Sequence, residues 1–372
     1  MGRGAGAVVL DRRALNRATL ARQLLLRRDP RGALATVRHL AGLQAQEPQE
    51  PHVGLWSRLA AFRPGELDDL LVSRRVVRTQ LMRRTLHLVT AEDCLRLRSV
   101  HQAILVARAT GTLGRRLPGV DLAALAAAAE PLFAAEPRTL PDVGRALAGR
   151  WPGAAARDLG DVLSSLLPLV QTTPRGLWRQ QAPARNTTVR AWLGRDLAGE
   201  SPDDVLDDLV LRYLRAYGPA AGADLRAWSG LSGLPAVVAR LRPRLRAFRD
   251  ERGRELLDVP DAPIPDRDEP APVRFLPACD NAVLGYDDRS RIVADEHRGL
   301  SVTGARLVLV DGSVAATWTG REREDGGVAV TVQPLRPLTP AERGEVGAEA
   351  ADLAAFLGDG APGTVEGIRP AG

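Results

Sequence analysis

The sequence has few side chains of the kind that carry out covalent or metal chemistry. It contains five histidines, two cysteines and no lysine, so all 51 basic residues are arginine. The histidines are scattered, and Cys94 and Cys279 lie far apart without cysteine or histidine neighbours, so we expect no zinc site. A disulfide is not expected in a reducing compartment. Without lysine, no side chain can form a Schiff base, which leaves only the terminal amine for that chemistry.

One polar pair remains, Gln44 and Gln46, in a segment rich in Gln, Glu and Pro. A carboxamide has one carbonyl acceptor and two N–H donors but no useful pKa, so it can orient a water without being an ordinary base. From their spacing alone, such glutamines are usually solvated or act as caps. No dinucleotide, phosphate-binding, metalloprotease or nucleophile-elbow motif occurs in a supporting context, and we expect no metal or other cofactor.

Charge and hydropathy limit the possible partners and the location of the protein only weakly. The formal net charge is only +6, and arginine in place of lysine is typical of GC-rich coding, so basicity alone does not indicate a nucleic-acid partner. No apolar run reaches the roughly 18 residues that a membrane span needs. The first residues lack the apolar core and cleavage site of a signal peptide. We therefore expect a cytoplasmic protein with no membrane partner.

The pattern that must position the glutamine pair is a group of helices followed by two strands. The length of 372 residues favours two or three modules. Residues 76–82 and 84–89 have the composition and alternation of two strands joined by a tight turn. Apolar periodicity predicts the preceding helices at 11–28, 30–43, 55–61 and from Pro64 onward. Helices followed by a β-hairpin form the order of a winged helix.

The same order recurs twice, which is a fold-level signal. The second group has helices at 91–108, 121–133, 140–150 and 158–169, then a predicted wing at 170–178 that turns at Pro174-Arg175-Gly176. The third group has helices at 203–217, 223–229 and 234–248, then a turn at 252–254 and a strand at 255–259.

The remaining segments predict a different C-terminal domain. A Pro/Asp-rich linker at 261–272 precedes strands at 273–276, 306–310, 313–318 and 328–332, with a hairpin turn at Asp311-Gly312. Thr339 is the expected N-cap of a helix over 340–357. The predicted fold is α+β, with three tandem winged-helix modules followed by a small antiparallel β-barrel-like domain. The expected boundaries are 11–110, 111–200, 201–260 and 273–372.

Four segments, in order along almost the whole chain, resemble the AlkZ-like winged-helix DNA glycosylase family. They are Leu43-Gln44-Ala45-Gln46; the first wing at 84–89; 217–219 with 224–231 in the third module; and 275–281 with 288–291 at the entry to the barrel. A related branch of the superfamily carries Gln-x-Asp. Because Gln46 occupies the third position here, the Gln-x-Gln branch fits better.

The resemblance implies a C-shaped scaffold around a basic DNA channel and a monofunctional DNA glycosylase. The implied reaction is hydrolysis of the N-glycosidic bond of N7-alkylated purines, and some family members also unhook interstrand crosslinks. Gln44 and Gln46 would be the catalytic pair, with Gln46 positioning the water and Gln44 assisting. A cationic N7-alkylpurine leaves as a neutral base without an acid, so unmodified purines should resist.

The implied partner is double-stranded DNA that contains alkylated or crosslinked bases. The DNA-binding candidates are Arg83, Arg84, His87, Arg175, Asp280, Asn281, Arg289 and Arg291. Arginines on wings would bind phosphates and displace counterions. The alternatives are a core-facing His87, a turn or cap role for Asp280 and Asn281, and pairing of Arg289 and Arg291 with Asp287, Asp288 or Asp295.

A non-catalytic winged-helix regulator or lesion sensor is the alternative function, because the fold alone does not fix function. Such a regulator would usually dimerise on spaced half-sites. Three modules in one chain instead favour a monomer that encloses one duplex and is nucleoid-associated when bound.

Overall fold

The computed structural model describes residues 8–361 and 363–368. Its α-helices are α1 (Arg12–Arg22), α2 (Ala33–His39), α3 (Glu50–Trp56), α4 (Pro64–Val72), α5 (Ala91–Thr112), α6 (Leu122–Ala135), α7 (Leu140–Leu147), α8 (Ala156–Leu166), α9 (Val189–Leu193), α10 (Pro202–Tyr217), α11 (Gly222–Ser229), α12 (Leu234–Leu241), α13 (Asn281–Leu284) and α14 (Pro340–Leu357). Its strands are β1 (Val9–Leu10), β2 (Leu43–Gln44), β3 (Val76–Gln80), β4 (Leu86–Thr90), β5 (Arg138–Thr139), β6 (Leu169–Gln171), β7 (Arg185–Thr188), β8 (Arg246–Asp250), β9 (Glu255–Asp258), β10 (Arg274–Leu276), β11 (Arg306–Val310), β12 (Ser313–Glu322), β13 (Val328–Pro334) and β14 (Thr364–Glu366).

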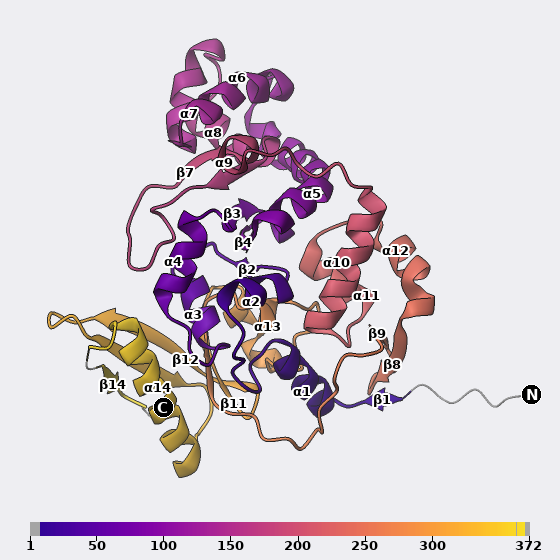
Figure 1. The fold of residues 1–372 in the computed structure, drawn as a ribbon, viewed down its shortest axis with the longest axis vertical. Coiled ribbons are helices and arrows are strands. Elements are labelled where there is room, and N and C mark those ends of the chain that lie inside the picture. The colour runs from indigo at the N-terminus through magenta and orange to yellow at the C-terminus, as the bar shows by residue number, and fades with distance from the viewer. Residues whose placement is uncertain (1–7, 362, 369–372) are drawn as a thin grey trace, which may run out of the picture.

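A six-stranded sheet of order β2-β4-β3-β6-β7-β5 joins the first two helical groups. Each half consists of a short strand and a hairpin, and the halves meet where β3 pairs antiparallel with β6 through Arg78↔Gln171 and Thr79↔Val170. Helices α6, α7 and α8 form one end of the molecule, and α2, α3 and α4 lie below the shared sheet (Figure 1). The predicted hairpin at 76–89 is therefore confirmed, and its β3 also connects two structural units.

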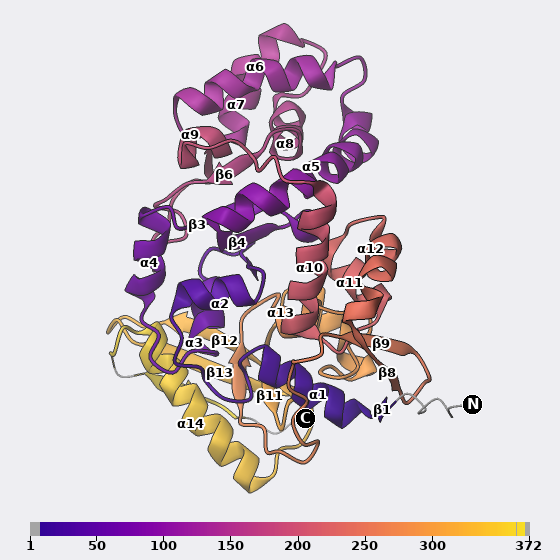
Figure 2. The same ribbon diagram turned by 45° about the vertical axis from the view of Figure 1, so that its right-hand side comes forward.

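The third group repeats the same element order on a smaller sheet. Helices α10, α11 and α12 precede the β8–β9 hairpin, and Ala220 forms an antiparallel bridge to Leu257 of β9. Strand β1 adds to the other side of β8, in parallel. This group lies beside α5, away from the C-terminal sheet (Figure 2). The assignment of all three groups as winged helices stays a prediction.

The C-terminal strands form an open sheet of order β10-β11-β12-β13-β14, so the barrel-like closure that we expected is not confirmed. Its last strand, β14, pairs in parallel with β13. Helix α14 packs against the sheet, and Val330 and Leu353 share a core with Val37 and Leu88 of the first group. Because this core is shared with the first group, the sheet can bury one face without closing on itself.

Two local predictions are confirmed, one at a hairpin turn and one at the start of a helix. Asp311 and Gly312 have φ values of 47° and 80°, the positive values that a tight hairpin turn needs at both central positions. Thr339 caps α14, and Glu342 completes a capping box.

Several predicted helices have different bounds. The helix expected at 30–43 is α2, which ends at His39, and Leu43 begins β2. Helix α1 ends at Arg22 because Leu24 adopts a left-handed φ of 58°. The helix expected at 55–61 is α3, which begins at Glu50. The segment 234–248 divides into α12 and β8, because Pro243 lies in a short 3-10 turn between them.

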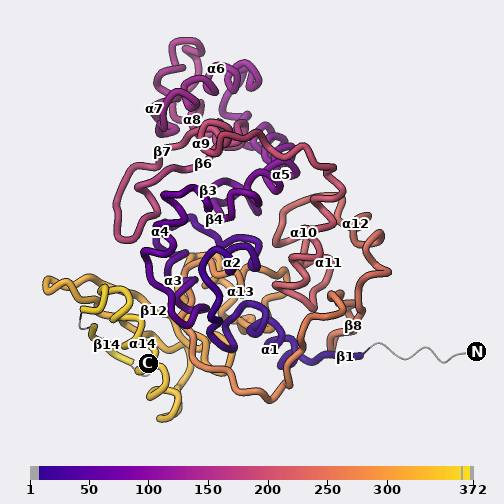
Figure 3. The backbone as a smooth tube through the Cα atoms, in the orientation of Figure 1, coloured from indigo at the N-terminus to yellow at the C-terminus, as the bar shows by residue number. Residues whose placement is uncertain are grey.

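The predicted wing at 170–178 contains only the first strand of its hairpin. Strand β6 ends at Gln171, and the chain then runs through a long loop, 172–184, before β7. In Figure 3 this loop extends past α4. Trp178 fixes it there, since its backbone N–H donates to Asp68 of α4 and its ring lies 4.9 Å from that of His52 in α3.

No helix of the described ranges is both long and apolar enough to cross a membrane.

Candidate active site

Gln44 and Gln46 lie at the end of the edge strand β2, where main-chain hydrogen bonds hold the backbone in place. Gln44 pairs with His87 of β4, and the N–H of Ala45 donates to the carbonyl of Leu86 over 2.8 Å. Arg78 donates to the carbonyl of Ala45 over 2.8 Å, between the two glutamines. The pair is therefore placed by a sheet and not by a mobile loop.

Asn281 supports the same strand from the C-terminal region. Its side-chain amide donates to the carbonyl of Gly42 over 2.7 Å. Gly42 has a φ of +104°, and a Cβ there would lie 2.7 Å from Val89, so this turn needs glycine. The chain thus enters β2 at a fixed angle just before Gln44.

Both carboxamides have a defined orientation, because each carbonyl accepts from a group that can only donate. Arg83 Nη2 donates to Gln44 Oε1 over 2.7 Å, and the backbone N–H of Leu86 lies 3.3 Å from Gln46 Oε1. Each carbonyl keeps one further lone pair, and each NH₂ group keeps its two donors. Gln44 is half-buried and Gln46 is exposed. Gln44 is therefore held by a short bond to a cation, whereas the exposed Gln46 has one bond of 3.3 Å. Both keep groups that can hydrogen-bond a water or a polar substrate atom.

Arg83 links this strand to the third helical group. It has a left-handed φ of 53° in the β3–β4 turn, and its Nη1 donates to the carbonyl of Trp228 over 2.9 Å. Burial lowers the pKa of Arg83, with a further decrease from Arg289 and opposing effects of Tyr217 and Cys279. The Arg83 side chain thus positions Gln44, whereas the sequence predicted that Arg83 contacts DNA.

His87 lies in the protein interior behind Gln44. Its side chain is 1% exposed, Nδ1 lies 3.0 Å from the Thr85 carbonyl, and Nε2 has no partner among the described residues. Burial and the nearby Arg83 lower the pKa of His87 to about 3, so the ring is neutral at neutral pH. The core-facing alternative describes this position, and phosphate contact has no geometric support.

Three of the other DNA-binding candidates are also interior groups. Asp280 forms a two-bond ion pair with Arg58, both bonds 2.8 Å long, and caps α13. Asn281 is buried at the Gly42 carbonyl, and Arg291 donates to the carbonyl of Pro219. Because their polar atoms bind protein groups, we assign positioning roles to Asp280, Asn281 and Arg291, and we do not propose that they contact DNA.

The remaining candidates keep some access to solvent. Arg84 is exposed in the β3–β4 turn, and Arg175 is half-buried in the loop 172–184, where it donates to the Ala182 carbonyl. Arg289 is half-buried and donates to Ser301. None of the ion pairs among described residues joins Arg289 or Arg291 to Asp287, Asp288 or Asp295, whereas Asp288 pairs with Arg252 and Arg254.

The sequence interpretation missed three carboxamides near Gln46, namely Gln80, Gln171 and Asn186, which line one cavity with it. No motif marks them, and only the β3–β6 and β6–β7 pairings bring them together.

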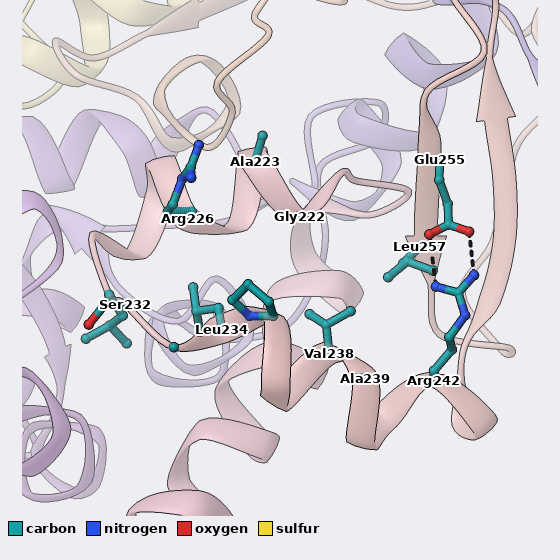
Figure 4. A pocket seen from close by; sticks show the side chains of 13 residues that line it. Gly222, Ala223, Arg226, Ser232, Leu234, Val238, Ala239, Arg242, Glu255 and Leu257 are labelled. Carbon is teal, nitrogen blue, oxygen red and sulfur yellow. Dashed lines mark hydrogen bonds and ion pairs between the residues drawn. The ribbon is translucent and has the colours of Figure 1, made fainter.

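A separate cavity of about 760 Å³ lies between α11, α12 and β9 and has neither Gln44 nor Gln46 in its lining (Figure 4). Its walls are largely apolar, with Leu234, Val238 and Leu257, and an Arg242–Glu255 ion pair closes one end. It is not a candidate active site, because no glutamine or asparagine is among its lining residues.

Comparison with known protein families matches residues 37–356 to the family described as DNA glycosylase AlkZ-like. The chain belongs to this family. Among solved structures, it is similar to the DNA glycosylase AlkZ of Streptomyces sahachiroi, with a TM-score of 0.77 and 21% identity over 96% of this chain and 100% of that one. A search of curated proteins found no match. Membership supports a DNA glycosylase with DNA as its substrate, and the structural likeness supports the mixed α+β fold.

Proposed function

We propose that this glycosylase hydrolyses the N-glycosidic bond of N7-alkylated purines in duplex DNA, with water placed by Gln44 and Gln46. The observation that carries the proposal is the contact of both carboxamide oxygens with donors, Arg83 for Gln44 and the Leu86 N–H for Gln46. Each glutamine keeps a carbonyl lone pair that can accept from water, and N–H donors that can bind the lone pair of the departing base.

The proposed reaction needs no strong acid or base. The C1′–N9 bond breaks, its electron pair moves to the base, and the charge of the N7-alkylated ring is neutralised. The water oxygen then bonds to C1′ of the oxocarbenium-like sugar and its proton is lost to solvent. Because the chain has no lysine, no side chain can form a Schiff base with the sugar, and the proposed product of this hydrolysis is an intact abasic site.

We further propose that the three helix–hairpin groups are winged helices that enclose the duplex as a monomer, with Arg84 and Arg175 on wings at the phosphates. Crosslinks joined through N7 carry the same activated bond and are included among the proposed substrates.

The decisive test is base release by the purified protein. Duplexes with one N7-methylguanine, with one N7-linked crosslink, and without a lesion are incubated in parallel, and abasic sites are scored as alkali-labile breaks. We expect release only from the modified duplexes, and strand breaks only after alkali. The double variant Gln44→Ala/Gln46→Ala, purified identically, controls for contaminating enzymes. Tight binding to unmodified DNA without any release would favour the regulator or lesion sensor instead.

Arg83→Ala is expected to slow base release in single-turnover assays on the order of 10²-fold, because Gln44 loses the donor that orients it. DNA affinity and its salt dependence should stay unchanged, since Arg83 contacts protein groups. Arg84→Ala is the neighbouring comparison, and it should reduce the salt slope of binding by about one. If Arg83→Ala reduces the salt slope of DNA binding and leaves the rate of base release unchanged, then Arg83 contacts a phosphate.

A further inference from the structure

A second polar site adjoins Gln46. It is a cavity of about 460 Å³ between the β3–β4 hairpin and helices α7 and α8 of the second group. This volume lies in the range of small-molecule sites. The cavity forms only because β3 pairs with β6, which brings the two groups together.

Four carboxamides line this cavity: Gln46, Gln80, Gln171 and Asn186. Gln80 accepts from Ser165 and donates to the Arg84 carbonyl, which fixes its side chain. Asn186 donates to the Ala184 carbonyl over 3.0 Å. Such groups offer donors and acceptors together, as the edge of a nucleobase does.

Gln171 is the residue that indicates a ligand. Its side chain is 8% exposed, and its Oε1 has no hydrogen-bond partner in the described part of the chain. Leaving a buried acceptor unpaired is unfavourable, so a donor supplied by a bound molecule would satisfy it. The adjacent positions on both neighbouring strands are Arg78 and Asn186, and neither side chain donates to it.

The other walls suit a flat, polar-edged ring. Leu86, Leu140 and Pro141 supply apolar surface for the ring faces. The lining also includes the carboxylate of Asp161 and the exposed Arg84, so it carries one charge of each sign and favours neither a cationic nor an anionic ring. Glycosylases that rotate a base out of the duplex read it through hydrogen bonds to its edge and through apolar or aromatic contacts to its faces.

We propose that, for lesions confined to one strand, this cavity binds the purine base, turned out of the helix beside Gln46, and that Gln171 accepts from the base's ring-edge N–H groups. The inference rests on the proposed function for the identity of the lesion. Gln80 and Asn186 then complete the recognition of the base edge, and Arg84 lies at the cavity toward the DNA backbone.

The test measures binding of the free base, so it does not depend on catalysis. Equilibrium dialysis with 7-methylguanine compares wild type with Gln171→Leu, which removes the acceptor, and Ser164→Trp, which fills the cavity from α8. We expect about tenfold weaker binding for Gln171→Leu and loss of binding for Ser164→Trp. Gln333→Leu, at an exposed position on β13, is the matched control and should bind as wild type does.

Two further measurements separate the outcomes. Gln44→Ala should still bind the free base. If wild type binds the free base but releases no base from the modified duplexes, then the proposed reaction is wrong and the cavity assignment stands. Thermal unfolding of Gln171→Leu should be unchanged or raised, because an unpaired acceptor is lost; a clear decrease would mean that Gln171 is structural. Three results would overturn the proposal. Wild type does not bind 7-methylguanine, both cavity variants bind it as tightly as wild type does, or deoxyribose 5-phosphate displaces it and purines do not.

Discussion

Gln46→Ala is expected to lower the single-turnover rate of base release by about 10²–10³-fold, the usual loss when one preorganised hydrogen-bonding group is removed. Gln44→Ala should lose less, because its side chain is half-buried and we assign it the assisting role. Affinity for undamaged DNA should not change for either variant, since neither side chain is charged.

Replacement by glutamate separates the two chemical functions of Gln46. Gln46→Glu keeps an oxygen that can accept from the Leu86 N–H and from water, but it loses both N–H donors. Retained release would mean that the carbonyl places the water. Loss as large as for Gln46→Ala would mean that the N–H groups stabilise the departing base. Full activity of both the alanine and glutamate variants would remove Gln46 from the mechanism.

Asp280→Ala is expected to lower the free energy of unfolding by about 3–5 kcal/mol, since it leaves a buried guanidinium without its partner. Arg58 is fully buried and has two 2.8 Å bonds to Asp280, whose side chain is 2% exposed. The substitution also removes the cap of α13. Urea unfolding of wild type and variant gives the difference directly.

Two controls make this prediction specific. Asp207→Ala breaks a comparable pair with Arg240 whose side chains are 25% and 41% exposed, so its cost should stay below about 1 kcal/mol. Arg58→Met combined with Asp280→Asn should recover much of the loss, because no charge remains unpaired. An Asp280→Ala protein with normal stability and weakened DNA binding would instead restore the DNA contact that the sequence indicated.

Local patterns in the sequence determined several elements because their signals lie within a few residues. The alternation at 76–89 predicted the hairpin, Asp311-Gly312 predicted its turn, and Thr339 predicted the start of α14. The Gln44/Gln46 segment is identified through its resemblance to a family, and the family match over residues 37–356 supports that membership. In contrast, β7 was missed because Arg185–Thr188 has no apolar alternation and is a strand only through its pairing with β6.

Tertiary structure alone decided how the candidate site is built. Arg83 and Arg84 are neighbours of the same type, yet one orients Gln44 from a half-buried position and the other is exposed, because a left-handed turn directs them differently. Asp280 is buried because Arg58, 222 residues earlier, reaches it. Gln171 and Gln46 line one cavity only because β3 pairs with β6. Residue types and local spacing are encoded in the sequence, whereas partners that lie far apart in the chain are fixed only when the sheets pair and the cores close.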